Sequence, residues 1–305
     1  MAKSSKWPTK PRSSSQYSAA LPIPLSSANL RFPSSLLQLL TADKPLPYRY
    51  AVKSLGTKHG ITPCFMAKPR EGLPGNSGHM HLSLTSSSTS ENLFHRSTPD
   101  PSPPYPDLAN LSDLGRHFLA GLLDGLPDVM PLVAPTINSY KRLVENFWAP
   151  VTVSWGLEHR AASIRLIAPP TSPPKATRFE IRVAGADANP YYVLAAILAL
   201  GFRGVEKKLK IKVPPLGKGE EVGGESDTGV RLAKTLKEAN ERFMRAGSVA
   251  RECFGDEFVE HFGGTREHEV KVWEEAVTDW YVSLPTLIAW GEWLGGRWLT
   301  NAVGR

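Results

Sequence analysis

The strongest constraint on the fold is the strict alternation of apolar and polar residues in the stretch TRFEIRV, residues 177–183. Side chains two positions apart in a β-strand point to the same side. One face of this predicted strand is therefore apolar and packs on a core. The other face carries a ladder of opposite charges, Arg178, Glu180 and Arg182.

Other stretches show either the same alternation or a helical period. Strands are predicted at residues 61–69, 79–84, 150–160 and 162–167, because apolar and polar residues alternate or β-formers cluster there. Apolar residues at helical spacing predict helices over residues 47–60, 108–135, 189–209 and 230–282. Strands that cluster in the middle of a helical chain favour a mixed α+β fold.

Composition narrows the class of protein further. A chain of 305 residues with 41% hydrophobic residues can bury a sizeable core. No apolar run approaches ~20 residues, so no membrane span and no membrane partner are expected. The two cysteines form neither a disulfide framework nor a zinc ribbon, which fits a reducing, cytoplasmic location. The net charge of +7 favours anionic ligands, but no basic repeat indicates nucleic acid.

Histidines and arginines gather around the predicted strands. His79 and His81 share a face of the strand at residues 79–84, either as a polar surface or as part of a ligand site. Five arginines occur in about forty residues, and a guanidinium grips carboxylate or phosphate oxygens with two hydrogen bonds: Arg142, Arg160, Arg165, Arg178 and Arg182. Two interpretations stay open, a salt-bridged surface strand and metal-assisted phosphoryl transfer to a carboxylate.

Five motifs in order resemble one known family: FMAKP, GNSGHMHLSL, APTINSYKRLVENFWAPVTVSWGLEHRAASIRL, TRFEIRVAGADANPYYVLAAILALGFRGVE and EEAVTDW. Together they resemble the C-terminal part of the glutamine synthetase catalytic domain, most of all that of the type I enzymes and their fungal relatives. The resemblance covers about residues 48–282. It implies an α+β fold in which an antiparallel sheet forms part of a barrel with helices outside.

The resemblance implies a catalytic metal ion and a nucleotide. His79 and Glu180 match two ligands of one divalent ion, Mg²⁺ or Mn²⁺, and His81 matches a second histidine near the substrate glutamate and phosphate. ATP is then the co-substrate. The implied reaction phosphorylates the γ-carboxylate of glutamate to an acyl phosphate, which ammonia or another amine attacks to give an amide. The protein would thus be a ligase of glutamine biosynthesis and nitrogen metabolism.

The resemblance also assigns roles to six substrate-contacting positions. Arg142 and Arg182 match arginines that hold glutamate, and Asn76 falls near an asparagine loop of the same site, in a turn one residue shorter than usual. The remaining three positions, Arg160, Arg165 and Arg178, match arginines that contact the nucleotide. Arg160 and Arg165 also match arginines that contact the transferred phosphoryl group, so these two are predicted to be catalytic.

The chain departs from the family pattern at one informative position. Trp148 stands where glutamate–ammonia ligases carry a glutamate that helps to bind ammonium and remove its proton. An indole accepts no proton, although it can offer a cation–π contact. Glu145, three residues earlier, could replace that glutamate only in a rearranged loop. Either the nucleophile is an amine larger than ammonia, or this branch tolerates tryptophan and still uses ammonia.

The resemblance fades before residue 48, so we expect three parts: a basic, disordered tail over residues 1–47, a partial catalytic domain over 48–282, and a divergent Trp-rich tail over 283–305. In the family, an N-terminal β-grasp domain and the first catalytic half supply most metal ligands. We expect both to be missing from this chain. The expected protein is therefore truncated, and the family's homo-oligomer is doubtful for it. The alternative to a ligase is a non-catalytic binding or structural relative.

Overall fold

Four of the five predicted strands lie in one mixed sheet. The structure is a computed structural model that describes residues 17–23, 45–145, 149–217 and 230–277. Among these residues the sheet has the order β1-β2-β5-β4-β3. Its strands are β1 (Tyr17–Ile23), β2 (Met80–Ser86), β3 (Trp155–Leu157), β4 (Ile164–Ile167) and β5 (Arg178–Ile181).

The sheet runs in both directions. β2 and β4 each pair antiparallel to β5, as the predicted antiparallel sheet requires. β1 pairs parallel to β2, however, and β3 pairs parallel to β4. The expected antiparallel sheet is therefore mixed; in the β3–β4 pair, the chain between the strands loops back and re-enters in the same direction. The α+β fold itself is confirmed, with a small open sheet.

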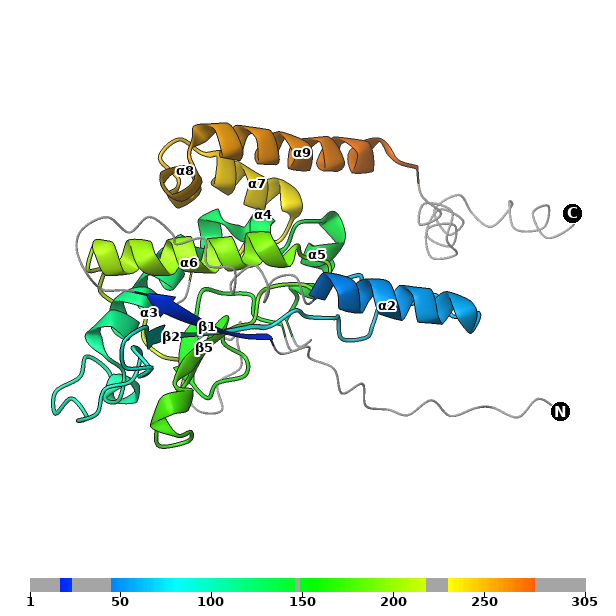
Figure 1. The fold of residues 1–305 in the computed structure, drawn as a ribbon. Helices are drawn as coiled ribbons and strands as arrows, with labels where there is room; N and C mark the ends of the chain where they lie inside the picture. Colours follow the sequence, from blue (N-terminus) through cyan, green and yellow to red (C-terminus); the bar gives the residue numbers. More distant parts are fainter. Residues whose placement is uncertain (1–16, 24–44, 146–148, 218–229, 278–305) are drawn as a thin grey trace, which may run out of the picture. The chain divides into compact units, whose positions relative to one another are not determined.

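Helices cover the apolar face of the sheet. The long helices α3 (Asp113–Gly125) and α6 (Pro190–Glu206) pack against each other beside it (Figure 1). Their axes approach closely at Gly121 and Gly204, where an added Cβ on either residue would overlap the backbone of the other helix. The remaining helices are α2 (Pro45–Lys58), α4 (Met130–Val133), α5 (Ile137–Arg142), α7 (Leu236–Met244), α8 (Val249–Phe254), α9 (Asp256–Glu275) and the 3-10 turns η1 (Pro106–Leu108), η2 (Leu126–Asp128) and η3 (Pro174–Ala176).

Aromatic side chains join the sheet to the helices. Phe179 on β5 stacks on Phe118 of α3, with ring centroids 6.1 Å apart and an interplanar angle of 2°. Phe94 contacts both rings, at centroid distances of 5.1 and 4.9 Å. All three side chains are fully buried, together with Leu82 of β2. The alternation read from the sequence therefore assigns the core face of β2 and β5 correctly, and the opposite face is left for polar groups.

One predicted strand is wrong. Residues 61–69 form no strand, and their backbone groups bond to side chains and loops. Asn138 accepts from the Lys68 backbone N–H (2.8 Å) and donates to its carbonyl (2.9 Å). Pro63 and Pro69 carry no N–H to donate to a ladder, which disfavours a strand here.

The chain divides into two units, residues 1–267 and 268–305, and every predicted site residue lies in the first. The three predicted domain boundaries stay predictions. Strand β1 falls within the predicted tail, most of which lies outside the described residues, as do the Trp-rich tail and Trp148. Among the described helices, none is long and apolar enough to cross a membrane.

Candidate functional site

The polar face of the sheet gathers one buried carboxylate and three basic side chains. Strand register places Glu180 of β5 directly opposite His81 of β2 and Arg165 of β4. Glu180 is 2% exposed, and its Oε1 lies 3.0 Å from Nδ1 of His79 and accepts from Nη1 of Arg182 at 2.6 Å. Its Oε2 accepts from Nη1 of Arg165 at 2.9 Å. Side chains from three strands therefore converge on one carboxylate.

The surroundings of Glu180 keep it ionised. Burial alone would raise its pKa, but the hydrogen bond from His79 and the charge of Arg182 outweigh burial and hold the pKa of this carboxyl well below its usual range. Burial and the nearby Arg182 lower the pKa of His79, against the opposing effect of Glu180. The His79 imidazole is therefore neutral near pH 7. It donates from Nδ1 and carries its lone pair on Nε2, the arrangement of a histidine that can ligate a metal.

His81 presents an unpartnered hydrogen-bond donor on the same face. Its Nδ1 accepts from Nε of Arg178 at 3.1 Å, so the ring proton is on Nε2. Burial lowers the pKa of His81 to about 4, and the ring is neutral near pH 7. Nε2 of His81 and Nε of Arg182 are both buried, and no described residue accepts from either. A buried donor without an acceptor is costly, which favours an acceptor ligand at this face.

The other predicted residues lie at different depths. Arg142 is 3% exposed and donates to the backbone carbonyls of residues 182–184, at 2.8 to 3.3 Å. Burial lowers its pKa to about 10, so it stays charged. Arg160 is exposed; burial lowers the pKa of Arg182, and the charge of Arg160 contributes to this lowering. Asn76 is exposed and its amide donates to the Met66 carbonyl at 3.0 Å. The structure therefore brings five of the predicted residues together around Glu180 and leaves Arg142, Arg160 and Asn76 at the border of this group.

Two carboxylates of this region were not singled out from the sequence. Glu158 accepts from Nε of Arg165 at 3.0 Å and also from its Nη2, while Thr171 donates to the other Glu158 oxygen at 2.9 Å. Glu158 follows β3 with φ of 57°, a left-handed conformation that sequence alternation does not reveal. Asp187 accepts from Thr136 (2.8 Å) and Ser139 (2.7 Å) and so fixes the start of α5.

Glu145, considered as a substitute for the missing flap glutamate, pairs instead with Arg231 at 2.7 Å. Both side chains are about half exposed. Residues 146–148, which follow Glu145 in the sequence, are outside the described part of the chain.

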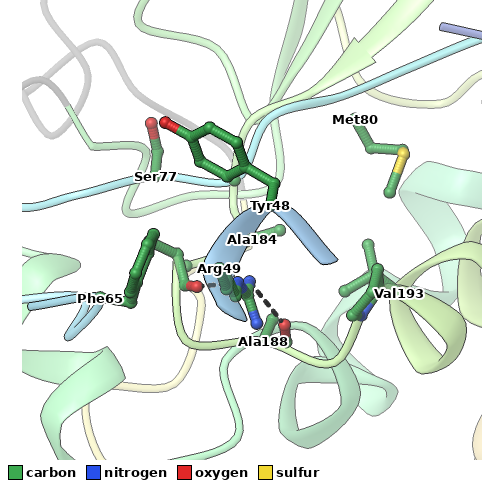
Figure 2. A pocket seen from close by; sticks show the side chains of 12 residues that line it. Tyr48, Arg49, Phe65, Ser77, Met80, Ala184, Ala188 and Val193 are labelled. Carbon is green, nitrogen blue, oxygen red and sulfur yellow. Dashed lines mark hydrogen bonds between the residues drawn. The ribbon is translucent and has the colours of Figure 1, made fainter. Parts of the chain in front are cut away.

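A small pocket lies behind the start of β2. Tyr48, Phe65, Met80 and Val193 line it, and its volume is about 60 Å³ (Figure 2). Arg49 of α2 donates across it to the carbonyls of Ala186 (2.5 Å) and Ala188 (3.1 Å). This arginine ties α2 to the turn that follows β5, so the pocket is a packing space of about two water molecules.

The polar face of the sheet around Glu180, called here the basic face, offers few ligands for a divalent metal ion among the described residues. His79 and Glu180 are suitable ligands, but Glu180 already accepts from three cationic or histidine side chains. Among the described residues no group of three or more His, Cys, Asp or Glu side chains is placed to hold a metal ion. Two protein ligands are fewer than a catalytic divalent site in a protein ordinarily uses. The described residues by themselves therefore do not fit the metal that the resemblance implies.

These features define the class of protein: a mixed α+β domain whose sheet presents an arginine- and histidine-rich face around a buried glutamate. Comparison with known proteins then identifies the family. A model of the glutamine synthetase catalytic domain matches residues 31–284. Type-1 glutamine synthetase 2 of Dictyostelium discoideum is 39% identical over 258 residues, which are 83% of this chain and 46% of the relative. The chain therefore belongs to the glutamine synthetase family.

Relatives with other amine substrates match as well. A glutamate–isopropylamine ligase of a Pseudomonas species is 38% identical over 242 residues, covering 79% of this chain and 50% of the ligase. The solved structure of apo GmaS without ligand has a TM-score of 0.65 and 30% identity, covering 80% of this chain and 52% of GmaS. The chain spans about half the length of the relatives it matches. The expected family is thus confirmed.

Proposed function

We propose that this chain carries the anion-binding side of the active site of an ATP-dependent glutamate–amine ligase. The observation that carries the proposal is the pair of buried, unpartnered donors, Nε2 of His81 and Nε of Arg182, beside an ionised Glu180. Both donors need an acceptor, and the oxygens of a carboxylate or a phosphoryl group supply one. Membership of a family of ligases supports the same substrates, glutamate and ATP.

Each arginine has a different role in this proposal. Arg182 holds the substrate glutamate, and Arg142, behind it, fixes the backbone that carries Arg182 through its carbonyl bonds. Arg178, oriented by His81, contacts the nucleotide. Arg160 and Arg165 neutralise charge on the transferred phosphoryl group, and Glu158 holds Arg165 in place.

The proposed reaction runs in two balanced steps. An oxygen of the glutamate γ-carboxylate attacks the γ-phosphorus of ATP, and the bond to the leaving ADP oxygen breaks. The nitrogen of an amine then attacks the acyl carbon and phosphate leaves, taking the bonding electrons, while the amine loses a proton. Charge stabilisation by fixed arginines is the main contribution of this chain, since phosphoryl transfer requires positioning and neutralisation more than covalent help. No step is assigned to a metal ion, because the described residues do not complete a metal site.

The nucleophile is ammonia or a larger amine. Relatives include a glutamate–isopropylamine ligase and a gamma-glutamylethanolamide synthetase, which extends the choice beyond ammonia. Trp148, the residue that raises the question, lies outside the described residues. A panel of ammonia, isopropylamine and ethanolamine, scored by ADP release in the presence of glutamate and ATP, separates these nucleophiles.

The second candidate is a non-catalytic member of the family that binds anions without turnover. The observation that favours it is the lack of a three-ligand metal group among the described residues. In this case the basic face keeps its affinity for nucleotide or glutamate, and no acyl phosphate forms.

Two measurements on the 305-residue chain test both candidates. Calorimetry measures ADP binding for the wild type, for Arg178→Ala, and for the control Arg96→Ala, a partly exposed arginine that pairs with Asp100 and Asp113. Hydroxylamine traps any acyl phosphate as a hydroxamate. Binding that Arg178→Ala weakens and Arg96→Ala does not, with hydroxamate formation, supports the ligase. The same binding without hydroxamate supports the non-catalytic candidate, and wild-type protein that binds neither ADP nor, in the same calorimetry, glutamate contradicts both.

A further inference from the structure

A second cavity lies apart from the Glu180 face, on the helical side of the first unit. Its volume is about 710 Å³, and it is formed by the end of α3, the turn η2, the segment 210–213 and the start of α8. This volume falls within the range of small-molecule sites, about 300–1,000 Å³. None of the residues assigned to glutamate, nucleotide or metal lines it.

Two lysines on a fixed segment face this cavity. Lys210 and Lys212 are exposed, and no described residue forms an ion pair with either. Nδ1 of His117 donates to the carbonyl that precedes Lys210 (2.7 Å), and the indole of Trp155 donates to the Val213 carbonyl (2.8 Å). The backbone of the pair is therefore held at both ends. In an extended segment the two positions are about 6–7 Å apart, a separation that two anionic groups of one molecule can bridge.

The carboxylates that line the cavity do not neutralise these lysines. Asp124 accepts from Arg203 at 2.7 Å. Asp128 accepts from the backbone N–H of Val249 at 2.8 Å and lies 3.4 Å from Arg245. Each of these carboxylates already interacts with another cation or donor, so neither neutralises the positive charges of Lys210 and Lys212.

Arg242 and Arg245 add further cationic groups to the lining, and the rest of the wall is apolar. Leu123 and Val153 are buried there, and Val213 and Val249 join them. Cationic groups beside an apolar wall suit a molecule that has anionic groups at one end and a hydrophobic or aromatic body at the other. We propose that this cavity binds a small organic polyanion, with its phosphate or carboxylate groups on Lys210 and Lys212 and its body against the valine and leucine wall.

The experiment measures pyrophosphate binding by calorimetry on the full 305-residue chain, at low salt and with EDTA present. We expect Lys210→Ala/Lys212→Ala to weaken the association at least tenfold, since each lysine offers a charge-assisted contact. The control Lys53→Ala/Lys58→Ala removes the same charge from exposed positions of α2 and should change the association less than twofold. In the Arg178→Ala variant, which removes the nucleotide arginine of the Glu180 face, ADP should bind the cavity more tightly than pyrophosphate, because ADP adds an aromatic body.

Other outcomes overturn the proposal. Equal weakening in both double variants would mean that only the overall charge matters. Unchanged binding in Lys210→Ala/Lys212→Ala, with loss in Arg178→Ala, would place the anion on the Glu180 face. Citrate is the second probe: stronger binding of citrate than of pyrophosphate identifies a polycarboxylate site, and the reverse a phosphate site. Failure of the Glu180 face to bind nucleotide leaves this measurement unaffected, because the two sets of residues are separate.

Discussion

Replacement of Glu180 by glutamine is the sharpest test of the basic face. The substitution keeps the volume of the side chain and removes its charge. In the wild type this carboxylate, with a side chain 3% exposed, balances Arg182 at 2.6 Å and Arg165 at 2.9 Å. Arg165 retains Glu158 in the variant, whereas the carboxylate that pairs with Arg182 is Glu180 itself. A buried guanidinium would thus lose its counter-charge.

The size of the effect follows from that loss. Removing one partner of a buried ion pair costs about 3–5 kcal/mol, and the pairing left to Arg165 places Glu180→Gln near the lower end, about 3 kcal/mol. A domain of this size loses about 2–4 °C of Tm for each kcal/mol, so the expected shift is about 6–12 °C downward. Urea denaturation followed by tryptophan fluorescence should give a lower midpoint with an unchanged slope.

The matched control is Glu241→Gln, because Glu241 is exposed on α7 and the substitution is chemically identical. Its free energy of unfolding should stay within about 0.5 kcal/mol of the wild type. A Glu180→Gln variant that is as stable as the wild type, or more stable, would refute the view that this carboxylate holds the arginines together. A gain in stability would instead indicate that the basic face is strained for ligand binding.

Three further substitutions or treatments test the packing and the thiols. Arg142→Met keeps the length of the side chain but leaves three backbone carbonyls after β5 without their donor; we expect about 2–4 kcal/mol less stability in urea. Gly121→Ala should lower Tm because its Cβ overlaps the backbone of α6, whereas Gly264→Ala, with open space around it, should raise stability by about 0.5–1 kcal/mol. Burial raises the pKa of the Cys253 thiol to about 11, so at pH 8 iodoacetamide should modify exposed Cys64 first; Cys253 should react only as the pH approaches its raised pKa, as mass spectrometry of the digested protein can show.

The face of each central strand could be predicted because alternation is a local property. Residues two apart must share a side, so TRFEIRV separated Phe179 from Glu180 before any pairing was known. The same rule placed His79 and His81 together. Their meeting with Glu180 depends on the register between β2 and β5, which joins residues about a hundred positions apart. The five motifs of the family supplied that long-range information, and alternation alone did not.

The features that the sequence did not reveal depend on conformation or on distant partners. Glu158 reaches Arg165 because its backbone is left-handed, an uncommon conformation for glutamate. The segment at residues 61–69 reads as a strand by composition, yet Asn138 supplies the hydrogen bonds that a neighbouring strand would have supplied. The parallel pairing of β3 with β4 requires the chain to loop back within a few residues. The alternation of apolar and polar residues does not indicate whether neighbouring strands run parallel or antiparallel.

The charged face of β5 admitted two interpretations, a solvated salt-bridged strand or a ligand site, and burial separates them. A solvated ladder leaves its charges in water, where each pair contributes little. Here Glu180 is 2% exposed and Arg182 is 7% exposed. A self-sufficient buried ladder would also satisfy its donors, yet Nε of Arg182 and Nε2 of His81 have no acceptor among the described residues. Four arginines, including exposed Arg160, outnumber Glu158 and Glu180 at this face. Buried, oriented donors without an acceptor are costly, and an anionic ligand would supply that acceptor, so we favour a ligand site over a self-contained set of ion pairs.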